Sequence, residues 1–427
     1  MIDINLIRKD ETRDKVIKSE LKRGRDKNKV IQVYELDIKV IKLRSEKEQL
    51  KKQSNFLQKE MANLKKNNKE EDFTAKLKER NTLENKIEVM EKEIKELEIN
   101  LLAYLNEIGN VLDDEVVFSL TEEDNKLIRE YQTDRKVLAN LPYDMIFKKV
   151  EGVDLERGTK LAGHRGFILK EEIALLKTAL SNYAVAFARE RKYLLVQPPV
   201  LMKKEIIAKT AQLSDFDDQL YSVGDEYYLI ATSEQPISMM FEDERFNPQD
   251  LPLKYIGESL CFRKEAGAHG KDNRGIFRVH QFDKIEQFVI CAPEESKFYF
   301  QEMVKTAEEF YQSLKISYKL ISIVSGAMND AAAIKYDLEA LFPHKDRYRE
   351  LVSVSNCTDY QSRSGEIRFG KGKIKGEKMY VHMLNGTLCA VQRTLCCLVE
   401  NYQTNDGIVV PEVLRKYYGA DFIPFKN

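Results

Sequence analysis

The sequence of 427 residues contains no long hydrophobic run. Its apolar stretches fall far short of the roughly 20 consecutive residues that a membrane-spanning helix requires. Hydrophobic residues make up 43% of the chain and charged residues 33%, which is the balance of a water-soluble protein. We therefore expect no transmembrane segment and no membrane partner.

The N-terminal stretch lacks the features of a targeting peptide. MIDINLIRKDETRDKV mixes acidic residues with basic ones and has no continuous apolar core. A signal peptide needs such a core, and a transit peptide is poor in acids. A cytoplasmic location is the expectation that remains.

The cysteines form no Cys-x-x-Cys pair, and two of them are adjacent in the sequence. Zinc knuckles need cysteines paired at short spacing, and disulfide frameworks belong to oxidising compartments. We therefore predict reduced thiols in a hydrophobic core. The residues concerned are Cys261, Cys291, Cys357, Cys389, Cys396 and Cys397.

Two common nucleotide-binding loops are also absent. No glycine-rich fingerprint of a dinucleotide-binding fold is found, and the nearest approach to a Walker A loop contains Gly365, Gly370 and Lys371. Gly372 stands where a Ser or Thr should hold magnesium, so we interpret this stretch as a turn between strands. The formal net charge of -1 does not argue against nucleic acid, because a phosphate-binding surface depends on local patches.

Over the first hundred positions, apolar residues recur at the alternating spacings of four and three that are typical of a coiled coil. The first series runs from about residue 30 to 65 and has two polar core positions, at Lys47 and Ser54. Its apolar members are Leu36, Val40, Leu43, Leu50, Leu57, Met61 and Leu64. The second series is Leu83, Ile87, Met90, Ile94, Leu97, Leu101, Tyr104 and Ile108.

A polar break, NNKEED at residues 67–72, separates the two series and predicts a turn. The two arms would then form an antiparallel hairpin, each arm extending about 50 Å at 1.5 Å per residue. A chain of this length is expected to contain two or three domains, and the hairpin would belong to the first of them.

The two arms differ in charge. Between Lys22 and Lys69 the chain has about nine more bases than acids, whereas between Glu70 and Glu98 it has about four more acids than bases. In one interpretation these charges only solvate the helices and pair across the seam. In the other, the surplus bases bind a phosphate backbone. The bases concerned are Arg44, Lys51, Lys52, Lys59, Lys65 and Lys66.

Beyond about residue 115, strand-like runs alternate with helical ones. KYLLVQPPVLM, YYLIAT and IFRVHQF are typical of strands, and EEIALLKTALSNYAVAFARER is typical of a helix. This alternation predicts an α+β fold: an antiparallel sheet flanked by helices, preceded by the antiparallel coiled-coil hairpin.

The most informative local segment runs from Glu258 to Val289 and is expected to form a strand, a Gly-rich basic loop and a second strand. Arg263 and Glu265 lie two residues apart, and so do Phe282 and Lys284, so each pair is predicted to share a face of the sheet. One alternative is a solvated edge of the sheet. The other is a site in which the arginine holds an anion and the glutamate accepts a hydrogen bond.

Several motifs in order along the chain resemble those of the seryl-tRNA synthetases, in their cytosolic eukaryotic form. The segment FRKE, loop, FRVHQFDKIE is similar to the second motif of class II synthetases, ATSEQPIS to the family's serine-binding loop, and NGTLCAVQRTLCCLVENYQ to the third motif. RELVSVSNCTDYQSR matches a further family segment, and QPPVLM, with Pro199, resembles the first motif. The class I motifs HIGH and KMSKS are absent.

The resemblance covers essentially the whole chain. It implies a tRNA-binding helical domain at residues 1–112 and a class II catalytic domain at residues 113–427. It also implies a serine–tRNA ligase, which joins L-serine to ATP as seryl-adenylate and transfers serine to the 3′-terminal adenosine of tRNA(Ser), with tRNA(Sec) as a further candidate. The tRNA would be bound by its long variable arm and its acceptor end, and a homodimer is implied across the first motif.

For ATP, the resemblance implies that Arg263 bridges the α-phosphate and the serine carboxylate, a task suited to a planar guanidinium. Arg393 would hold the γ-phosphate, Glu265 would accept from the adenine amino group, and Phe282 would stack on the adenine ring. Glu350 and Ser353 would bind Mg²⁺ through hard oxygen ligands. Further residues assigned to the nucleotide are Lys264, Val279, Leu351 and Val352.

For serine, the resemblance assigns Thr232, Ser233, Glu234 and Glu286 to the ammonium and hydroxyl groups, with Asn385 and Thr387 closing the pocket. A polar pocket of this kind rejects alanine because the partners of the missing hydroxyl stay unpaired. The group that reads the hydroxyl is left open among Glu286, Asn385 and Thr387.

Two other functions remain as alternatives. The chain could be a synthetase-like ligase that loads an amino acid onto a carrier protein, but such relatives lack the hairpin. It could also be a non-catalytic interaction protein whose coiled coil is the functional element, although the retained Arg263, Glu350 and Arg393 oppose that.

Overall fold

The computed structural model describes residues 1–67, 69–210, 219–266, 274–370 and 379–426. The chain divides into two compact units. One consists of Ile2–Gly109, and the other of Asn110–Asn427 together with Met1. Lys371, Gly372 and His269 lie outside the described residues, as does most of the Gly-rich loop at 267–273.

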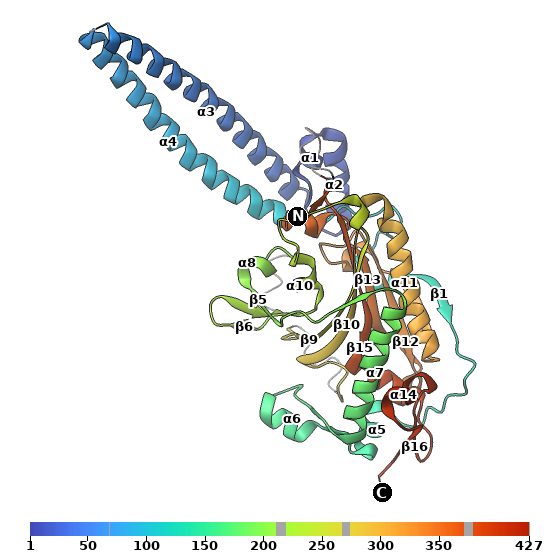
Figure 1. The fold of residues 1–427 in the computed structure, drawn as a ribbon. Coiled ribbons are helices and arrows are strands. Elements are labelled where there is room, and N and C mark those ends of the chain that lie inside the picture. The colour runs from blue at the N-terminus through green and yellow to red at the C-terminus, as the bar shows by residue number, and fades with distance from the viewer. Residues whose placement is uncertain (68, 211–218, 267–273, 371–378, 427) are drawn as a thin grey trace. The chain divides into compact units, whose positions relative to one another are not determined.

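The first unit contains the predicted hairpin. Helix α3 (Asn28–Lys66) and helix α4 (Glu70–Asn106) run antiparallel, side by side, and are preceded by α1 (Ile4–Arg8) and α2 (Asp10–Lys22) (Figure 1). The turn between the long helices falls within the predicted polar break. Arg8 fixes the short helices to α3, because its guanidinium donates to both carboxylate oxygens of Asp37 at 2.7 and 2.9 Å.

The seam of the hairpin follows the predicted series with one correction. Val40, Ser54, Leu57 and Met61 are buried at the expected positions of α3. In α4, however, Tyr104 is 39% exposed and Leu105 is buried, so the series shifts by one residue near its end. An undistorted helix has 3.6 residues per turn, and its buried face therefore drifts away from a strict seven-residue repeat.

The second unit is built on a mixed sheet that is antiparallel throughout except at one edge. In the described part of the chain it has eight strands. In spatial order they are β1 (Lys126–Tyr131), β11 (Tyr318–Ser322), β12 (Ile334–Phe342), β13 (Arg347–Asn356), β15 (His382–Ala390), β10 (Gln281–Cys291), β9 (Leu253–Phe262) and β4 (Leu194–Val196). Only the edge strand β4 runs parallel to its neighbour.

Smaller elements surround this sheet (Figure 1). The helices are α5 (Tyr143–Val150), α6 (Leu155–Ala162), α7 (Glu171–Glu190), α8 (Lys204–Ile207), α10 (Glu234–Met239), α11 (Ser296–Ser313), α12 (Tyr360–Ser364), α13 (Val391–Asn401) and α14 (Glu412–Tyr418). The short strands are β2 (Val153–Asp154), β3 (Ile168–Leu169), β5 (Leu201–Lys203), β6 (Ser222–Val223), β7 (Tyr227–Leu229), β8 (Arg245–Phe246), β14 (Arg368–Phe369), β16 (Gly407–Val409) and β17 (Phe422–Pro424).

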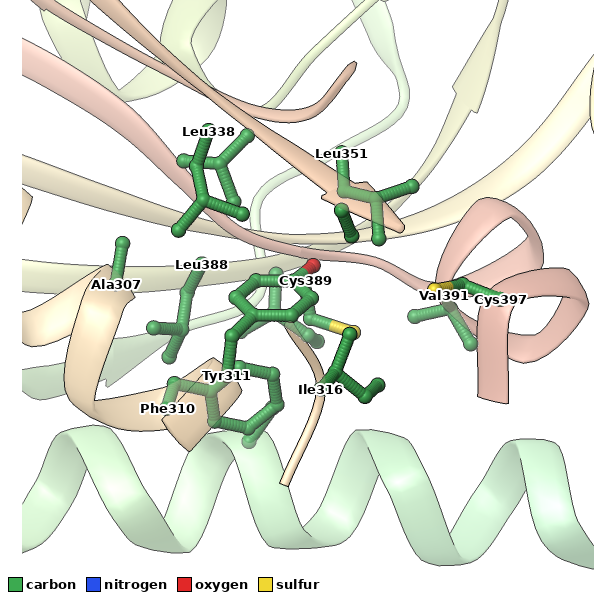
Figure 2. Packing of buried hydrophobic residues seen from close by; sticks show 14 of the residues in the cluster. Ala307, Phe310, Tyr311, Ile316, Leu338, Leu351, Leu388, Cys389, Val391 and Cys397 are labelled. Carbon is green, nitrogen blue, oxygen red and sulfur yellow. The ribbon is translucent and has the colours of Figure 1, made fainter. Parts of the chain in front are cut away.

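The hydrophobic core lies between one face of the sheet and the helices α7, α11 and α13. Figure 2 shows part of it, where side chains of the sheet meet those of α11 and α13: Leu338, Leu351, Leu388 and Cys389 on the strands, and Ala307, Phe310, Tyr311, Val391 and Cys397 on the helices. The predicted core thiols are confirmed, since all six cysteines are free and buried. Burial raises the pKa of Cys389 to about 12, which keeps it protonated at neutral pH.

One predicted strand is wrong in part. IFRVHQF was expected to be extended throughout, but β10 begins only at Gln281, and residues 276–280 form an irregular segment. Ile276, Phe277 and Val279 are buried in the core as loop residues. Their apolar character reflects this burial and not pairing in a sheet, a distinction that periodicity in a short run does not reveal.

Candidate active site

A cavity of about 270 Å³ lies on the polar face of the sheet. Its lining includes most of the residues expected at the nucleotide and amino-acid sites. These are Thr232, Glu234, Arg263, Glu265, Val279, Phe282, Glu286, Glu350, Leu351, Ser353, Asn385, Thr387 and Arg393. Segments that are distant in the sequence therefore meet around one space.

Three of the expected residues do not line this cavity. Ser233 is fully buried, with its hydroxyl directed toward Gly257 of β9, where an added Cβ would lie 2.5 Å from it. Val352 faces the hydrophobic core. Lys264 lies next to Arg263, and its backbone N–H donates to the carbonyl of Gln219 at 2.9 Å.

The side chains of β10 point alternately into the hydrophobic core and into the cavity. Ile285 and Val289 are core residues, whereas Lys284 and Glu286 line the cavity. This is the face relationship expected of a strand, and it confirms that Phe282 and Lys284 lie together. The expectation that Arg263 and Glu265 share a face of a strand is wrong, because β9 ends at Phe262 and both residues belong to the following loop.

Two β-bulges adjust which side chains reach the cavity. In β13, Leu351 is an extra residue between the pairs Leu338–Val352 and Glu339–Glu350. Glu350 and Ser353 are three residues apart and would face opposite sides of a regular strand, but the bulge allows both to line the cavity. Leu388 is the corresponding extra residue in β15.

A buried ion pair lies at one end of the cavity. Lys284 Nζ is 2.5 Å from Glu286 Oε2, and the two side chains are only 9% and 2% exposed. The same ammonium donates to the Thr232 hydroxyl at 3.1 Å, and the Thr387 hydroxyl donates to Glu286 Oε2 at 3.3 Å. These contacts fix the Glu286 carboxylate in position.

A second carboxylate lies close to this pair. Glu234, at the start of α10, accepts hydrogen bonds from the amides of Gln361 at 2.8 Å and Asn385 at 3.0 Å. Burial raises the pKa of Glu234, and the charge of Glu286 raises it further, whereas Lys284 opposes both effects. Burial likewise raises the pKa of Glu286, against the lowering effect of Lys284.

Arg263 lines the same cavity, and its positive charge lowers the pKa of Glu234 and Glu286 and also that of Glu350. Its guanidinium is anchored by a 3.3 Å hydrogen bond from Nε to the carbonyl of Ala231, and its centre lies 5.2 Å from the ring centroid of Phe282. Its backbone N–H donates to the carbonyl of His280 at 2.9 Å. The remaining N–H donors of the planar guanidinium fit an anion with two oxygen atoms.

At the other end, Arg393 lies near the start of α13 and faces Glu350. Arg393 Nη1 is 3.6 Å from Glu350 Oε2 and donates to the Glu350 carbonyl at 3.3 Å. Removal of water raises the pKa of Glu350, but Arg393 and Lys335 outweigh this effect and the pKa is lowered. Glu350 is therefore ionised over the whole neutral range.

The sequence analysis assigned no role to several residues that the structure places here. They are Phe277, Arg278, Lys284, Asn329, Lys335, Ser355, Ala390 and Gln392. Arg278 Nη1 pairs with Glu265 Oε2 at 2.7 Å, and the guanidinium of Arg393 lies 5.0 Å from the ring centroid of Phe277. Its spacing of two residues from Phe282 and from Glu286 could have indicated that Lys284 lines the site. The positions of Lys335 and Gln392, in contrast, depend on the pairing of strands that are far apart in the sequence.

The basic residues of α3 fall into two groups. Arg44 pairs with Glu98 at 2.6 Å and Lys51 with Glu91 at 2.9 Å, both across the hairpin. Within the described residues, Lys52, Lys59, Lys65 and Lys66 are exposed and have no carboxylate partner. Pairing across the seam therefore accounts for Arg44 and Lys51, whereas phosphate binding by the other four lysines stays a prediction.

Two protein-family models match the chain. The tRNA synthetase class II core domain (G, H, P, S and T) matches residues 216–402, and the seryl-tRNA synthetase N-terminal domain matches residues 1–112. Together with the antiparallel sheet and its polar cavity, the first match defines a class II aminoacyl-tRNA synthetase.

Relatives that match over the whole length of the chain indicate which family within this class it belongs to. The cytoplasmic serine–tRNA ligase of Schizosaccharomyces pombe is 46% identical over 438 residues, which span 100% of this chain and 97% of the relative. The structure of the Naegleria fowleri cytoplasmic enzyme in complex with AMP aligns with a TM-score of 0.89 at 42% identity, covering 100% of this chain and 99% of the other. The Pyrococcus horikoshii seryl-tRNA synthetase complexed with ATP gives 0.93 at 34% identity, covering 100% of both chains.

The chain therefore belongs to the seryl-tRNA synthetase family. Its reaction is the aminoacylation of tRNA with serine, and the comparisons do not favour the carrier-protein ligase or the non-catalytic interaction protein. The expected cytoplasmic location agrees with the names of the relatives. Among the helices that the structure describes, none has the length and apolar character needed to cross a bilayer.

Proposed function

We propose that the cavity activates serine at two adjoining subsites that Arg263 connects. Thr232, Glu234 and Glu286 bind the amino acid at the buried end, and Glu350 and Arg393 bind the ATP phosphates at the other. The observation that carries this proposal is the placement of Arg263, which lines the cavity together with both sets of residues. Its guanidinium is the group that bridges the serine carboxylate and the α-phosphate.

Activation is mainly a matter of positioning and charge stabilisation. The serine carboxylate attacks the α-phosphorus of ATP and pyrophosphate leaves, so negative charge is concentrated at the phosphorus centre in the transition state. Fixed cations that line the cavity stabilise this charge without reorganising. No covalent enzyme nucleophile is required.

The nucleotide base occupies the region of Glu265 and Phe282. The Phe282 ring offers an apolar face for stacking on adenine. Glu265 is held by Arg278 through Oε2, which leaves Oε1 as an acceptor for the adenine amino group. Complexes of relatives with AMP and ATP support ATP as the nucleotide substrate.

Mg²⁺ fits beside Glu350 and Ser353. The bulge at Leu351 brings a carboxylate and a hydroxyl to the same side of the cavity, and hard oxygen ligands of this kind suit the ion. When bound with ATP, the ion neutralises phosphate charge. The chain's own contribution is to orient these two oxygen ligands while Arg393 provides a fixed positive charge.

The transfer step requires tRNA. We assign residues 1–112 to tRNA binding and residues 113–427 to catalysis, with the long variable arm of tRNA(Ser) on the hairpin and the acceptor end at the cavity. Four exposed lysines of α3 that were predicted to bind tRNA, Lys52, Lys59, Lys65 and Lys66, have no carboxylate partner among the described residues and are available for phosphate contacts. The M. kandleri SerRS, solved in complex with A. aeolicus tRNASec, is similar to this chain in fold at 15% identity and a TM-score of 0.60, and we keep tRNA(Sec) as a second candidate.

A C2 homodimer completes the proposal. The edge strand β4 exposes Leu194 by 59% and Leu195 by 42% beside the segment that contains Pro199. An uncovered edge strand with apolar side chains is a natural surface for pairing with a second copy.

The activity is tested by exchange of pyrophosphate into ATP with each amino acid in turn, followed by charging of total tRNA. We expect exchange with serine and little with alanine, glycine or threonine. Exchange with a different amino acid, or loading of a carrier protein in place of tRNA, would refute the proposed function.

A further inference from the structure

Lys284 is a buried lysine at the amino-acid end of the cavity, and the assignments above give it no substrate to bind. Its ammonium contacts Glu286 at 2.5 Å and Thr232 at 3.1 Å. Both contact residues belong to the proposed serine subsite. An ammonium that is only 9% exposed loses its hydration, and it is stabilised here by the carboxylate next to it.

The groups that face Glu286 come from several elements. Lys284 lies on the same strand, Thr387 on β15, Glu234 at the start of α10, and Arg263 in the loop after β9. Cys261 of β9 is close enough to experience the same charges. Two carboxylates thus lie in one buried pocket, and in the absence of a cation one of them would tend to take up a proton.

The charges of this pocket match those of an amino acid. Two carboxylates and the Lys284 ammonium leave one net negative charge, which suits one substrate ammonium. Arg263 provides the positive charge that suits the substrate carboxylate. A zwitterionic amino acid therefore satisfies both ends, whereas an analogue without an amino group leaves a carboxylate unpaired.

We propose that Lys284 is a positioning residue for serine binding, which holds Glu286 in place and keeps Glu234 and Glu286 ionised so that they receive the ammonium of the amino acid. This inference rests on the proposed serine subsite. It adds a residue that sets the pH range over which the subsite functions and that favours amino acids over hydroxy acids.

The test is the pH dependence of the KM for serine in pyrophosphate exchange, measured for the wild type and for Lys284→Met. Removing the ammonium raises the pKa values of Glu234 and Glu286, so serine binding weakens as pH falls through them. Below a carboxylate pKa, we expect the variant's KM for serine to rise about tenfold per pH unit. The wild-type KM should be nearly flat over the same pH range, because the Lys284 charge lowers the pKa of both carboxylates.

Two further variants distinguish the effect of the Lys284 charge from a general effect of substitution on the fold. Lys284→Arg keeps the positive charge and should restore the flat profile. Lys177→Met is the matched control. Lys177 pairs with Asp283, which lies on the same strand as Lys284, but Lys177 itself does not line the cavity. The dependence of KM on pH in this variant should therefore follow that of the wild type. The KM for ATP should change less than the KM for serine in Lys284→Met, because Lys284 contacts Glu286 and Thr232 directly whereas only its charge acts on Glu350. A variant profile parallel to the wild type, with KM raised equally at every pH, would overturn the inference.

A measurement on the wild type needs no substitution. Titration calorimetry of serine binding at pH 7, in buffers of different ionisation enthalpy, reports the protons released or taken up. If Lys284 keeps both carboxylates ionised, as we propose, serine binds with its own ammonium and no net proton is exchanged. Release of about one proton per serine would contradict the role of Lys284. If the wild type failed to exchange pyrophosphate with serine at all, the proposed function itself would fail, which is a different result.

Discussion

Arg393 and Glu350 face each other across the nucleotide end of the cavity, with Nη1 of the arginine 3.6 Å from Oε2 of the glutamate. The arginine also donates to the backbone carbonyl of the same glutamate at 3.3 Å. A cation and an anion positioned in this way can bind a phosphate and its metal ion side by side. The Arg393 guanidinium is held close to Glu350 before the substrate arrives.

Glu350→Ala should abolish serine-dependent pyrophosphate exchange almost completely. The variant would lose the oxygen ligand that we propose for Mg²⁺, and raising the Mg²⁺ concentration should restore part of the rate by mass action. Exchange rates measured across a Mg²⁺ series check this expectation. Recovery with Zn²⁺ alone would indicate a different kind of metal site.

Arg263→Ala should reduce the rate of adenylate formation by about a hundredfold or more, as expected when a fixed donor to transition-state charge is lost. The fold should be retained, because among the described residues the side chain donates to one backbone group, the carbonyl of Ala231. Pyrophosphate exchange measures the loss and thermal unfolding measures the fold. Arg245→Ala, which changes an exposed arginine of β8, is the matched control. A nearly normal exchange rate in Arg263→Ala would disprove the bridging role.

Glu286→Ala should lower the discrimination between serine and alanine by about ten- to a hundredfold, equivalent to the 1–3 kcal/mol that a buried unpaired hydrogen-bonding group costs. The ratio of kcat/KM for the two amino acids is the relevant measurement. Thr387→Val and Asn385→Ala provide the comparison, because Thr387 donates to Glu286 whereas Asn385 donates to Glu234. If Glu286→Ala left the ratio of kcat/KM for serine and alanine unchanged, Thr387 or Asn385 would be the residue that recognises the serine hydroxyl.

Changing Lys52, Lys59, Lys65 and Lys66, four exposed lysines of α3, should weaken tRNA binding. Replacing Lys52, Lys59, Lys65 and Lys66 by Gln removes up to four phosphate contacts, so the plot of log affinity against log salt should become less steep by up to about 0.7–0.9 per contact. Serine activation should be unaffected, because adenylate formation does not use tRNA.

Arg44 and Lys51 provide the contrasting pair. Since they are engaged with Glu98 and Glu91, replacing both by Gln should change the salt dependence less than two changes among the four lysines. An equal loss of slope in the two groups would show that the cross-hairpin pairs open to bind phosphate. An unchanged slope in the fourfold variant would refute the assignment of this surface to tRNA.

Leu194→Asp should shift the protein from dimer to monomer. A carboxylate on the exposed face of β4 would be desolvated without a partner in the proposed interface. Light scattering coupled to size exclusion, over a range of concentrations, measures the change. Val89→Asp places the same charge on the hairpin, where Val89 is 65% exposed, and should leave the mass unaltered. A wild-type protein that is monomeric at all concentrations would contradict the dimer.

The sequence by itself determined the features that depend on local repetition. The spacing of apolar residues predicted both arms of the hairpin, because a buried stripe on a helix must recur at its own period. The two-residue spacing of Phe282 and Lys284 likewise predicted that they share a face of β10. The ordered motifs indicated the family, since their residues stand in the same order along the chain as in its members.

Only the tertiary structure decided how these segments combine. The extra residues Leu351 and Leu388 are defined by strand pairing, so the sequence did not show that Glu350 and Ser353 line the same cavity. The burial of Ile276 and Phe277 in a loop, and the hydrogen bond from Gln361 to Glu234, depend on contacts between distant segments. Periodicity reports which face of an element is buried, whereas a site requires knowing what packs against that face.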